Sequence, residues 1–295
     1  MLSLHAAHAP KPRARQSRIG LAIAGGGPVG AMYELGALRA LDEACEGLDL
    51  TRLDCYVGVS SGAFFAAGLA NRMDTAELCR IFITGDSADV QFQPETFLSP
   101  AFGEYVRRAA SIPRLTTRLL RDLWSGRSDS RWSDLLNRVG SLVPTGLFDN
   151  REVERFLHDV FTRQGRSNDF RALGKPLYVI GVDLDSGEAV RFGDAGWDDV
   201  PISRAVQASA ALPGLYPPVE MQDKSGRTRH IVDGALRRTM HASVVLDRDV
   251  DLLLGINPLV PFNPGDDSPE DAQQHRYSDR RIAEGGLPGV LSQTL

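Results

Sequence analysis

Short apolar runs, each followed by a stretch of helical periodicity, recur along the chain from residue 19 onward. The first run, residues 19–24, is followed by three glycines. Beyond them, apolar side chains return at helical spacing, at Met32, Leu35, Leu38, Leu41 and Cys45. The pattern predicts a strand, a glycine loop and a helix whose apolar side carries these residues.

A second apolar run, residues 55–59, leads into residues 60–70, which are apolar on nearly every side. We expect a strand followed by a buried helix, because a helix without a polar face has to be covered by other elements. Further strands are predicted at residues 177–182, 189–192, 230–232 and 251–256. Helical stretches lie between them, which indicates a three-layer α/β fold with a mainly parallel central sheet and helices on both faces.

Residues 85–148 differ in character and are predicted to form a helical insertion. Between residues 95 and 140 there are eight arginines and five acidic residues, with aromatic and leucine side chains among them. This composition is typical of amphipathic helices with a basic face. Two interpretations remain open: a cap that packs on the sheet with a solvated charged side, or a segment that contacts a lipid surface peripherally.

The chain of 295 residues, 42% of them hydrophobic, is long enough for one α/β domain with extensions. We assign this domain to residues 18–262. Residues 1–17 contain basic residues and no acid, so we expect a flexible basic tail. Residues 263–295 are expected to form a polar linker that ends in a short apolar segment.

Composition and charge argue against several classes of protein. The formal net charge of −5 provides no basic field for nucleic acid, and three cysteines are too few for a disulfide framework. The His and Cys residues lack the spacing of a metal site, so neither a metal nor another cofactor is expected. Because the first eighteen residues lack the apolar stretch of a signal peptide and no run has the length of a membrane span, we expect a cytoplasmic protein, soluble or peripheral to a membrane. Export by a route that needs no cleaved signal stays open.

The glycine loop at residues 25–30 matches G-x-G-x-x-G through Gly25, Gly27 and Gly30, the pattern of dinucleotide-binding loops. A dinucleotide fold also needs an acidic residue at the end of the second strand to hold the ribose. The acidic residues in this region all precede that strand. We therefore favour another use, because the backbone N–H groups of a glycine loop can converge on one point, as an oxyanion hole requires.

The second strand runs into Gly58-Val59-Ser60-Ser61-Gly62, which fits G-x-S-x-G, the signature of a nucleophilic serine on a sharp turn between a strand and a helix. Ser60 is the candidate nucleophile, and Gly58 and Gly62 supply the small neighbours that a strained turn needs. The alternative for Ser60 is an N-cap on the following helix. Ser61 would lie in the first helical turn and is expected to be structural.

A serine nucleophile needs a base, and histidine is the standard choice. Of the six histidines, only His230 and His241 stand near a suitable partner. Between them lies Asp233, which follows a predicted strand and precedes Gly234, so its carboxylate is accessible. The residues alone leave open whether a histidine or Asp233 itself takes the proton.

In combination, these motifs resemble those of the patatin-like phospholipases of bacterial type. The resemblance rests on the G-G-G-P-V-G loop, the G-V-S-S-G turn, the D-G-A element at residues 233–235 and the A-S-A-A-L-P segment at residues 208–213. It covers about residues 19–261. One departure is Val29, because the family loop usually carries Arg or Lys at this place.

The resemblance implies a lipid acyl hydrolase, of the phospholipase A or lipase type, that cleaves fatty-acyl esters of lipids without a metal or cofactor. Ser60 and Asp233 would form a Ser–Asp dyad without histidine. The oxyanion hole would be formed by loop residues Gly25, Gly26, Gly27, Val29 and Gly30. Pro28 has no N–H, which leaves the N–H groups of Gly26, Gly27 and Val29 as the expected donors. The alternative is a catalytically weak or inactive lipid- or protein-binding module with the same fold.

Overall fold

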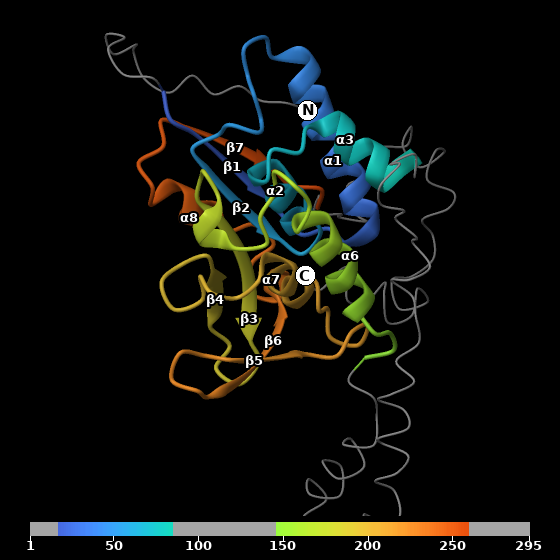
Figure 1. Ribbon diagram of the computed structural model, residues 1–295, viewed down its shortest axis with the longest axis vertical. Helices are drawn as coiled ribbons and strands as arrows, with labels where there is room; N and C mark the ends of the chain where they lie inside the picture. The colour runs from blue at the N-terminus through green and yellow to red at the C-terminus, as the bar shows by residue number, and fades with distance from the viewer. Residues whose placement is uncertain (1–16, 85–145, 260–295) are drawn as a thin grey trace, which may run out of the picture.

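A seven-stranded mixed sheet lies at the centre of the protein (Figure 1). The computed structural model describes residues 17–84 and 146–259. The strands are β1 (Ile19–Ile23), β2 (Cys55–Val59), β3 (Leu177–Asp183), β4 (Ala189–Phe192), β5 (Val219–Gln222), β6 (Thr228–Asp233) and β7 (Leu252–Ile256). Their order is β5-β6-β3-β2-β1-β7, and β4 pairs with β3 off this path. Strands β7, β1, β2 and β3 are parallel, whereas β4 and β6 are antiparallel to β3, and β5 to β6. The predicted α/β fold with a mainly parallel sheet is confirmed.

Helices cover both faces of this sheet. They are α1 (Gly27–Ala44), α2 (Ser61–Ala70), α3 (Thr75–Cys79), α6 (Arg151–Phe161), α7 (Ile202–Ser209) and α8 (Ala242–Leu246), with short helical turns at η1 (Arg80–Thr84), η3 (Phe170–Ala172) and η4 (Gly234–Leu236). The larger core cluster contains buried side chains of α1, α2, α6 and α7, whereas α8 packs against the opposite face of β1, β2 and β3. Figure 1 shows α8 on one side of the strands and α1, α2 and α6 on the other. The predicted three layers are therefore present.

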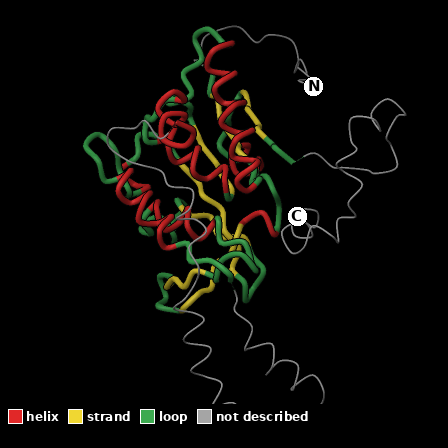
Figure 2. Tube along the Cα trace, turned by 90° about the vertical axis from the view of Figure 1, so that its right-hand side faces the viewer, coloured by secondary structure: helices red, strands yellow, loops and turns green. Residues whose placement is uncertain are grey.

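The antiparallel strands lie at one end of the molecule. Figure 1 shows β4, β5 and β6 toward the lower end, away from α1 and α3. In Figure 2 the strands reach that same end with helices only above it. The helical layers are thus concentrated beside the parallel strands.

The buried helix expected after the second strand is α2, in which every residue except Phe64 is buried. It begins at Ser61 and packs on β2, β1 and β3. Its lack of a polar face and its central position agree, because a helix that is apolar all round gains most from burial on every side.

The buried side of α1 differs from the prediction. Leu35 and Leu38 are buried, but Met32 is 55% exposed and Cys45 lies on the surface beyond the helix. Successive α-helical residues are rotated by about 100°, so Met32 points away from the side that Leu38 occupies. The residue that takes the expected place of Met32 on the buried side is Glu34.

Strand β5 has no counterpart in the sequence prediction, and β6 begins two residues before the predicted strand. The residues of β5 alternate between buried and exposed along the strand, which pairs with β6 at the edge of the sheet. An alternation over four residues is too short to stand out from the neighbouring loops.

Several predictions concern residues outside the described ranges. The basic tail, the arginine-rich part of the insertion at residues 95–140, the polar C-terminal segment and the domain boundary at 262 lie there and stay predictions. The domain boundary at 18 lies within the described ranges, but it also stays a prediction. The described end of the insertion, residues 146–148, is not helical and pairs with residues 214–215. Within the described ranges, each helix is too short or too polar to cross a membrane.

Candidate active site

The carboxyl ends of β2 and β6 meet on one edge of β3. Ile180 of β3 pairs with Val59, the last residue of β2, and the next residue, Gly181, pairs with Asp233, the last residue of β6. Strand β4 pairs with the other edge of β3. Because β2 is parallel and β6 antiparallel to β3, the two strands point toward each other. Ser60, which follows Val59, is therefore placed beside Asp233.

Ser60 occupies the sharp turn between β2 and α2. Its backbone angles, φ 50° and ψ −120°, lie in a region that is unfavourable for a residue with a Cβ atom. The glycines on either side make the turn possible. A Cβ at Gly58 would lie 2.5 Å from the Cα of Ala63, and a Cβ at Gly62 would lie 2.5 Å from the carbonyl oxygen of Ala24. The strained turn predicted around Ser60 is present.

Ser60 Oγ donates a hydrogen bond of 2.7 Å to Asp233 Oδ2, and both residues are buried. We call Ser60 and Asp233 the candidate pair. The second carboxylate oxygen, Oδ1, accepts a hydrogen bond of 2.9 Å from the N–H of Ala235. Ser60 stands at the N-cap position of α2, but its side chain makes no capping hydrogen bond there and bonds to Asp233 instead.

The last residue of α7, Ser209, and the segment that follows the helix support both members of the candidate pair. Ser209 Oγ accepts a hydrogen bond of 2.9 Å from the N–H of Ser60 and donates one of 2.6 Å to the carbonyl of Ile180. The carbonyl of Ala211 accepts the N–H of Asp233 at 3.0 Å. This explains the A-S-A-A-L-P motif physically, although the sequence indicated no role for Ser209.

Burial raises the pKa of the Asp233 carboxyl from its ordinary 3.8 to about 6. The hydrogen bonds from Ser60 and from the N–H of Ala235 oppose this effect, because they stabilise the ionised form. At neutral pH the carboxylate is still mostly ionised, and it is a stronger base than an exposed aspartate.

The glycine loop between β1 and α1 lies against the Ser60 side chain. A Cβ at Gly25 would lie 3.0 Å from the Cβ of Ser60, so a larger residue would press on the candidate nucleophile. Gly27 has a φ of +61°, which glycine adopts without strain. The N–H of Gly30 bonds to the carbonyl of Gly26 and begins the hydrogen-bond ladder of α1.

The remaining N–H groups of this loop divide into engaged and free ones. The N–H of Gly25 donates to a backbone carbonyl, and the N–H of Gly26 donates to Ser61 Oγ, each at 2.9 Å. No hydrogen bond of the Gly27 or Val29 N–H is formed with any residue in the described ranges. Gly26, which we expected to be an oxyanion donor, is thus already engaged, and Gly27 and Val29 are left for a ligand.

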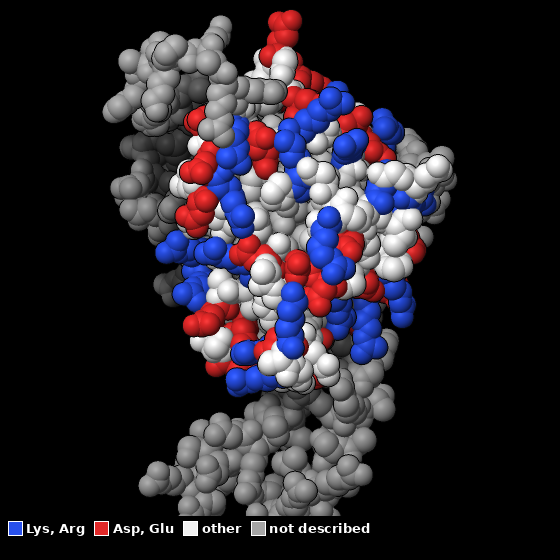
Figure 3. Space-filling view, turned by 60° about the vertical axis from the view of Figure 1, so that its left-hand side comes forward, with Lys and Arg blue, Asp and Glu red and all other residues white. Residues whose placement is uncertain are grey.

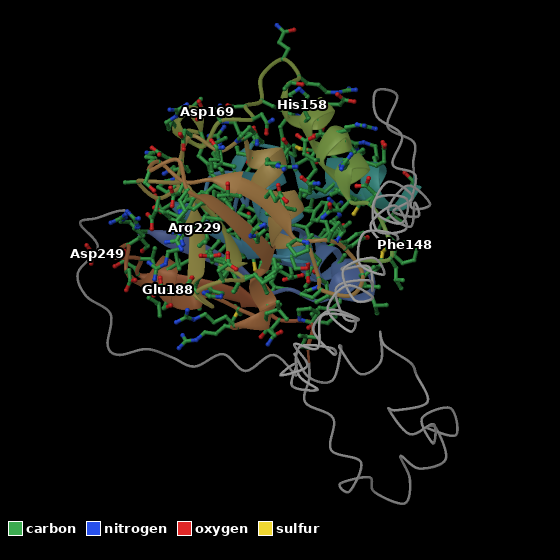
Figure 4. All side chains as sticks on the ribbon, turned by 90° about the horizontal axis from the view of Figure 1, so that it is seen from below. Phe148, His158, Asp169, Glu188, Arg229 and Asp249 are labelled. Atoms are coloured by element: carbon green, nitrogen blue, oxygen red, sulfur yellow. The ribbon has the colours of Figure 1, made fainter. Side chains whose placement is uncertain are left out.

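Within the described part of the chain, no histidine is hydrogen-bonded to the candidate pair. The His230 ring faces Asp185 at 3.4 Å, and His241 is buried, which lowers the pKa of its ring. His158 lies on α6, and Figure 4 shows it far from Glu188 in the turn between β3 and β4. The same part of the chain contains no group of three His, Cys, Asp or Glu side chains that could hold a metal ion.

The solvent-facing side of α1 is apolar beside the free N–H groups. Over its first three turns the exposed residues are Gly27, Pro28, Val29, Met32, Tyr33 and Gly36. None of them is charged, and the Val29 side chain is 84% exposed. By contrast, Figure 3 shows basic and acidic side chains intermixed on the face that comes forward from the α8 side. Within the first three turns of α1, the exposed side next to the glycine loop therefore carries no charged residue.

Glu34 of α1 is a polar residue of this region that the sequence analysis missed. It is fully buried, and its Oε1 atom accepts a hydrogen bond of 2.8 Å from Ser61 Oγ. Burial raises the pKa of the Glu34 carboxyl to about 8, against the opposing hydrogen bond from Ser61. The signal that could have identified it is its spacing, since Glu34 lies one helical turn from both Gly30 and Leu38 on the buried side.

Glu34→Gln should remove a pH dependence from the stability of the protein. The pKa of the Glu34 carboxyl is 4.5 in its ordinary state and about 8 in the folded protein, so the folded protein holds a proton that the unfolded chain releases between these values. Proton binding by Glu34 therefore stabilises the folded protein fully below the lower pKa. The free energy of unfolding falls as the pH rises from that value through the upper pKa, by at most about 1.4 kcal/mol per pH unit. Denaturant unfolding at acidic and at alkaline pH should show a larger loss in the wild type than in Glu34→Gln. Equal losses would contradict the prediction.

Comparisons with known proteins give one family model and several solved structures that are similar to this chain. A family model described as patatin-like phospholipase matches residues 21–246. No curated protein gives a significant match. Among solved structures, VipD from Legionella pneumophila is 19% identical with a TM-score of 0.37, and the match covers 77% of this chain and 47% of VipD.

Two structures of ExoU, a type III effector protein, are also similar. ExoU from Pseudomonas aeruginosa in complex with SpcU is 20% identical with a TM-score of 0.34, and the match covers 66% of this chain and 38% of that chain. The other ExoU structure is 22% identical with a TM-score of 0.35, with 95% and 53% covered. The chain therefore spans about half of the length of these proteins or less.

Proposed function

The chain belongs to the patatin-like phospholipase family, and from this premise we propose that it hydrolyses fatty-acyl esters of lipids with Ser60 as the nucleophile and Asp233 as the base. The hydrogen bond of 2.7 Å between Ser60 Oγ and Asp233 Oδ2 carries the proposal. It joins a hydroxyl on a strained turn to a buried carboxylate, next to a loop whose Gly27 and Val29 N–H groups bond to no described residue. A serine, a base within hydrogen-bond reach and donors for an oxyanion are the parts that acyl transfer needs.

In the first half of the reaction, Asp233 accepts the hydroxyl proton of Ser60 while Oγ bonds to the ester carbonyl carbon. The carbonyl oxygen becomes an oxyanion, to which the N–H groups of Gly27 and Val29 donate hydrogen bonds. When the carbonyl re-forms, the bond to the alcohol breaks. The alcohol leaves with the proton that Asp233 held, and the acyl group stays on Ser60.

In the second half, a water molecule attacks the acyl carbon, and Asp233 accepts a proton from that water. The same N–H groups stabilise the second oxyanion. Its collapse breaks the bond to Ser60 Oγ, which takes back the proton from Asp233. The fatty acid is released, and the candidate pair returns to its initial state.

The apolar side of α1 supports a lipid as the substrate. Val29 supplies one of the two proposed donor groups, and its exposed side chain begins the uncharged surface that continues to Met32 and Tyr33. An acyl chain whose carbonyl oxygen reached the Val29 N–H would lie next to this surface. The predicted lipid-surface contact through residues 95–140 concerns residues outside the described ranges and stays a prediction.

Hydrolysis of a fluorescent acyl ester together with labelling by a serine-reactive phosphonate tests the proposed function. We expect turnover of the ester, release of fatty acid from phospholipid vesicles and a label on the peptide that contains Ser60. Binding to the vesicles with neither turnover nor labelling would instead support the lipid-binding module without activity.

The rate of ester hydrolysis should depend on the ionisation of Asp233. The base has to be ionised, so with a pKa of about 6 for this carboxyl, kcat/KM on a soluble ester should rise tenfold per pH unit below that value and level off above it. A pH profile measures this limb. Its midpoint should shift little with temperature, as for a carboxyl group. A midpoint that falls steadily on warming is characteristic of imidazole and would contradict Asp233 as the base.

A further inference from the structure

The burial of the Glu34 carboxyl costs desolvation free energy, which an apolar residue at the same position of α1 would avoid. A buried carboxyl loses its hydration and needs hydrogen bonds in exchange. Its Oε2 atom has no partner among the described residues, and its neighbours Leu35 and Leu38 on the same side of the helix are apolar. A leucine or methionine could fill this position without an unsatisfied polar atom. The hydrogen bond that the other oxygen, Oε1, accepts from Ser61 is what a leucine or methionine could not provide.

Two hydrogen bonds form a chain that runs from Gly26 of the glycine loop through Ser61, the residue after Ser60, to Glu34. Ser61 Oγ donates to Glu34 Oε1 at 2.8 Å, and the N–H of Gly26 donates to the same Oγ at 2.9 Å. The carboxyl also lies directly against the loop, since a Cβ at Gly26 would lie 3.2 Å from Oε1. In the described part of the chain, this is the only hydrogen-bonded link between the loop and residues 60–62.

The direction of the Ser61 hydroxyl decides whether this link can form. A serine hydroxyl has one proton and two lone pairs, and it rotates until its partners fix it. Glu34 takes the proton, which turns a lone pair toward the N–H of Gly26. Without that acceptor, the buried proton of the hydroxyl loses its partner and nothing fixes the rotation of the hydroxyl. The hydrogen bond from the N–H of Gly26 then competes with orientations in which the lone pairs point elsewhere, and the hold on Gly26 is weakened.

We propose that Glu34 is a positioning residue, which fixes the N–H groups of Gly27 and Val29 relative to Ser60 by orienting the Ser61 hydroxyl. The inference rests on the proposed function, because it assigns these two groups to the oxyanion. Glu34 does not touch the reacting atoms. Its effect passes through Ser61 to Gly26, the residue directly before the first donor.

Two substitutions of similar size separate positioning from packing. Glu34→Gln keeps an oxygen that can accept the Ser61 proton, and Glu34→Met fills the same space without an acceptor. With a short soluble ester, and with rates normalised to phosphonate-labelled Ser60, we expect Glu34→Gln to stay near the wild-type kcat. Glu34→Met should lower kcat by about 10²-fold at an unchanged KM, as for the loss or displacement of an oxyanion donor.

The effect should depend on Ser61. Ser61→Ala removes the same link and should also lower kcat, and Glu34→Met should add little in the Ser61→Ala background. Such non-additivity is expected for residues that act through one hydrogen-bond chain. Full additivity of the two losses would overturn the inference.

Hydrogen exchange of the peptide that contains Gly26 gives a readout that needs no catalysis. We expect faster exchange in Glu34→Met and Ser61→Ala than in the wild type, and wild-type exchange in Glu34→Gln. Wild-type kcat in folded Glu34→Met, or unchanged exchange in both disrupting variants, would overturn the positioning role. If the wild type neither hydrolyses the ester nor takes the label, the proposed function is wrong instead, and the exchange rates alone decide whether Glu34 holds the loop.

Discussion

Ser60→Ala is expected to lower kcat/KM on a soluble acyl ester by about 10⁴-fold or more and to abolish labelling by a phosphonate, because it removes the atom that forms the acyl-enzyme. The backbone N–H groups of the glycine loop remain and sustain only a small residual rate. The loss of one buried hydrogen bond to Asp233 should reduce the free energy of unfolding by about 1–2 kcal/mol, which is too little to unfold a domain of this size. Thermal unfolding and ester hydrolysis on the same preparation measure the two effects.

Ser61→Ala is the matched control for this experiment. It removes the neighbouring hydroxyl but leaves Ser60 Oγ and its bond to Asp233 in place, so the phosphonate should still label the protein, although more slowly. If Ser61→Ala alone lost the label while Ser60→Ala kept it, the nucleophile would be the other serine of the turn.

Asp233→Asn should lower the rate of turnover by about 10³- to 10⁴-fold, as expected when the base can no longer accept a proton. Asparagine has the same shape, and its amide oxygen can still accept the N–H of Ala235, which bonds to Oδ1 in the wild type. The fold should therefore persist. A hydrolysis assay, with circular dichroism as the check on folding, measures the loss.

His230→Ala and His241→Ala are the controls for the base, since neither ring bonds to the candidate pair within the described residues. Both variants should keep substantial turnover. His241 is buried, so the rate of the His241→Ala variant has to be compared per folded molecule. A folded His241→Ala protein that lost activity while Asp233→Asn kept it would point to a histidine base.

The parts of the fold that could be predicted from sequence are those with a strong local pattern. The strands β1 and β2 and the buried helix α2 were predicted almost to the residue, because an apolar run bounded by glycine or serine has few alternatives. The short edge strand β5 was missed, and the apolar side of α1 was placed around Met32, which faces solvent. Both errors arose where the local pattern is weak, and tertiary packing decides which side of an element is covered.

The candidate site divides in the same way. Ser60 and the glycine loop were candidates because each motif has a local geometric reason, such as the small neighbours of a strained turn. The choice of Asp233 over a histidine came from the family resemblance. Ser209 and Glu34 could not be identified, because their partners, the N–H of Ser60 and the hydroxyl of Ser61, are distant in sequence. The engagement of the Gly26 N–H was missed for the same reason.

By itself, the sequence determined the local conformations: a strand that ends in a serine turn, a glycine loop before a helix, and an aspartate at the end of another strand. Only the tertiary structure decided that β2 and β6 approach along one edge of β3 from opposite directions, so that Val59 and Asp233 pair with consecutive residues. The physical reason is that local backbone preferences act over a few residues, whereas Ser60 and Asp233 are 173 residues apart. Strand direction and register come from pairing across the sheet, and these set the distance between a hydroxyl and the carboxylate that can accept its proton.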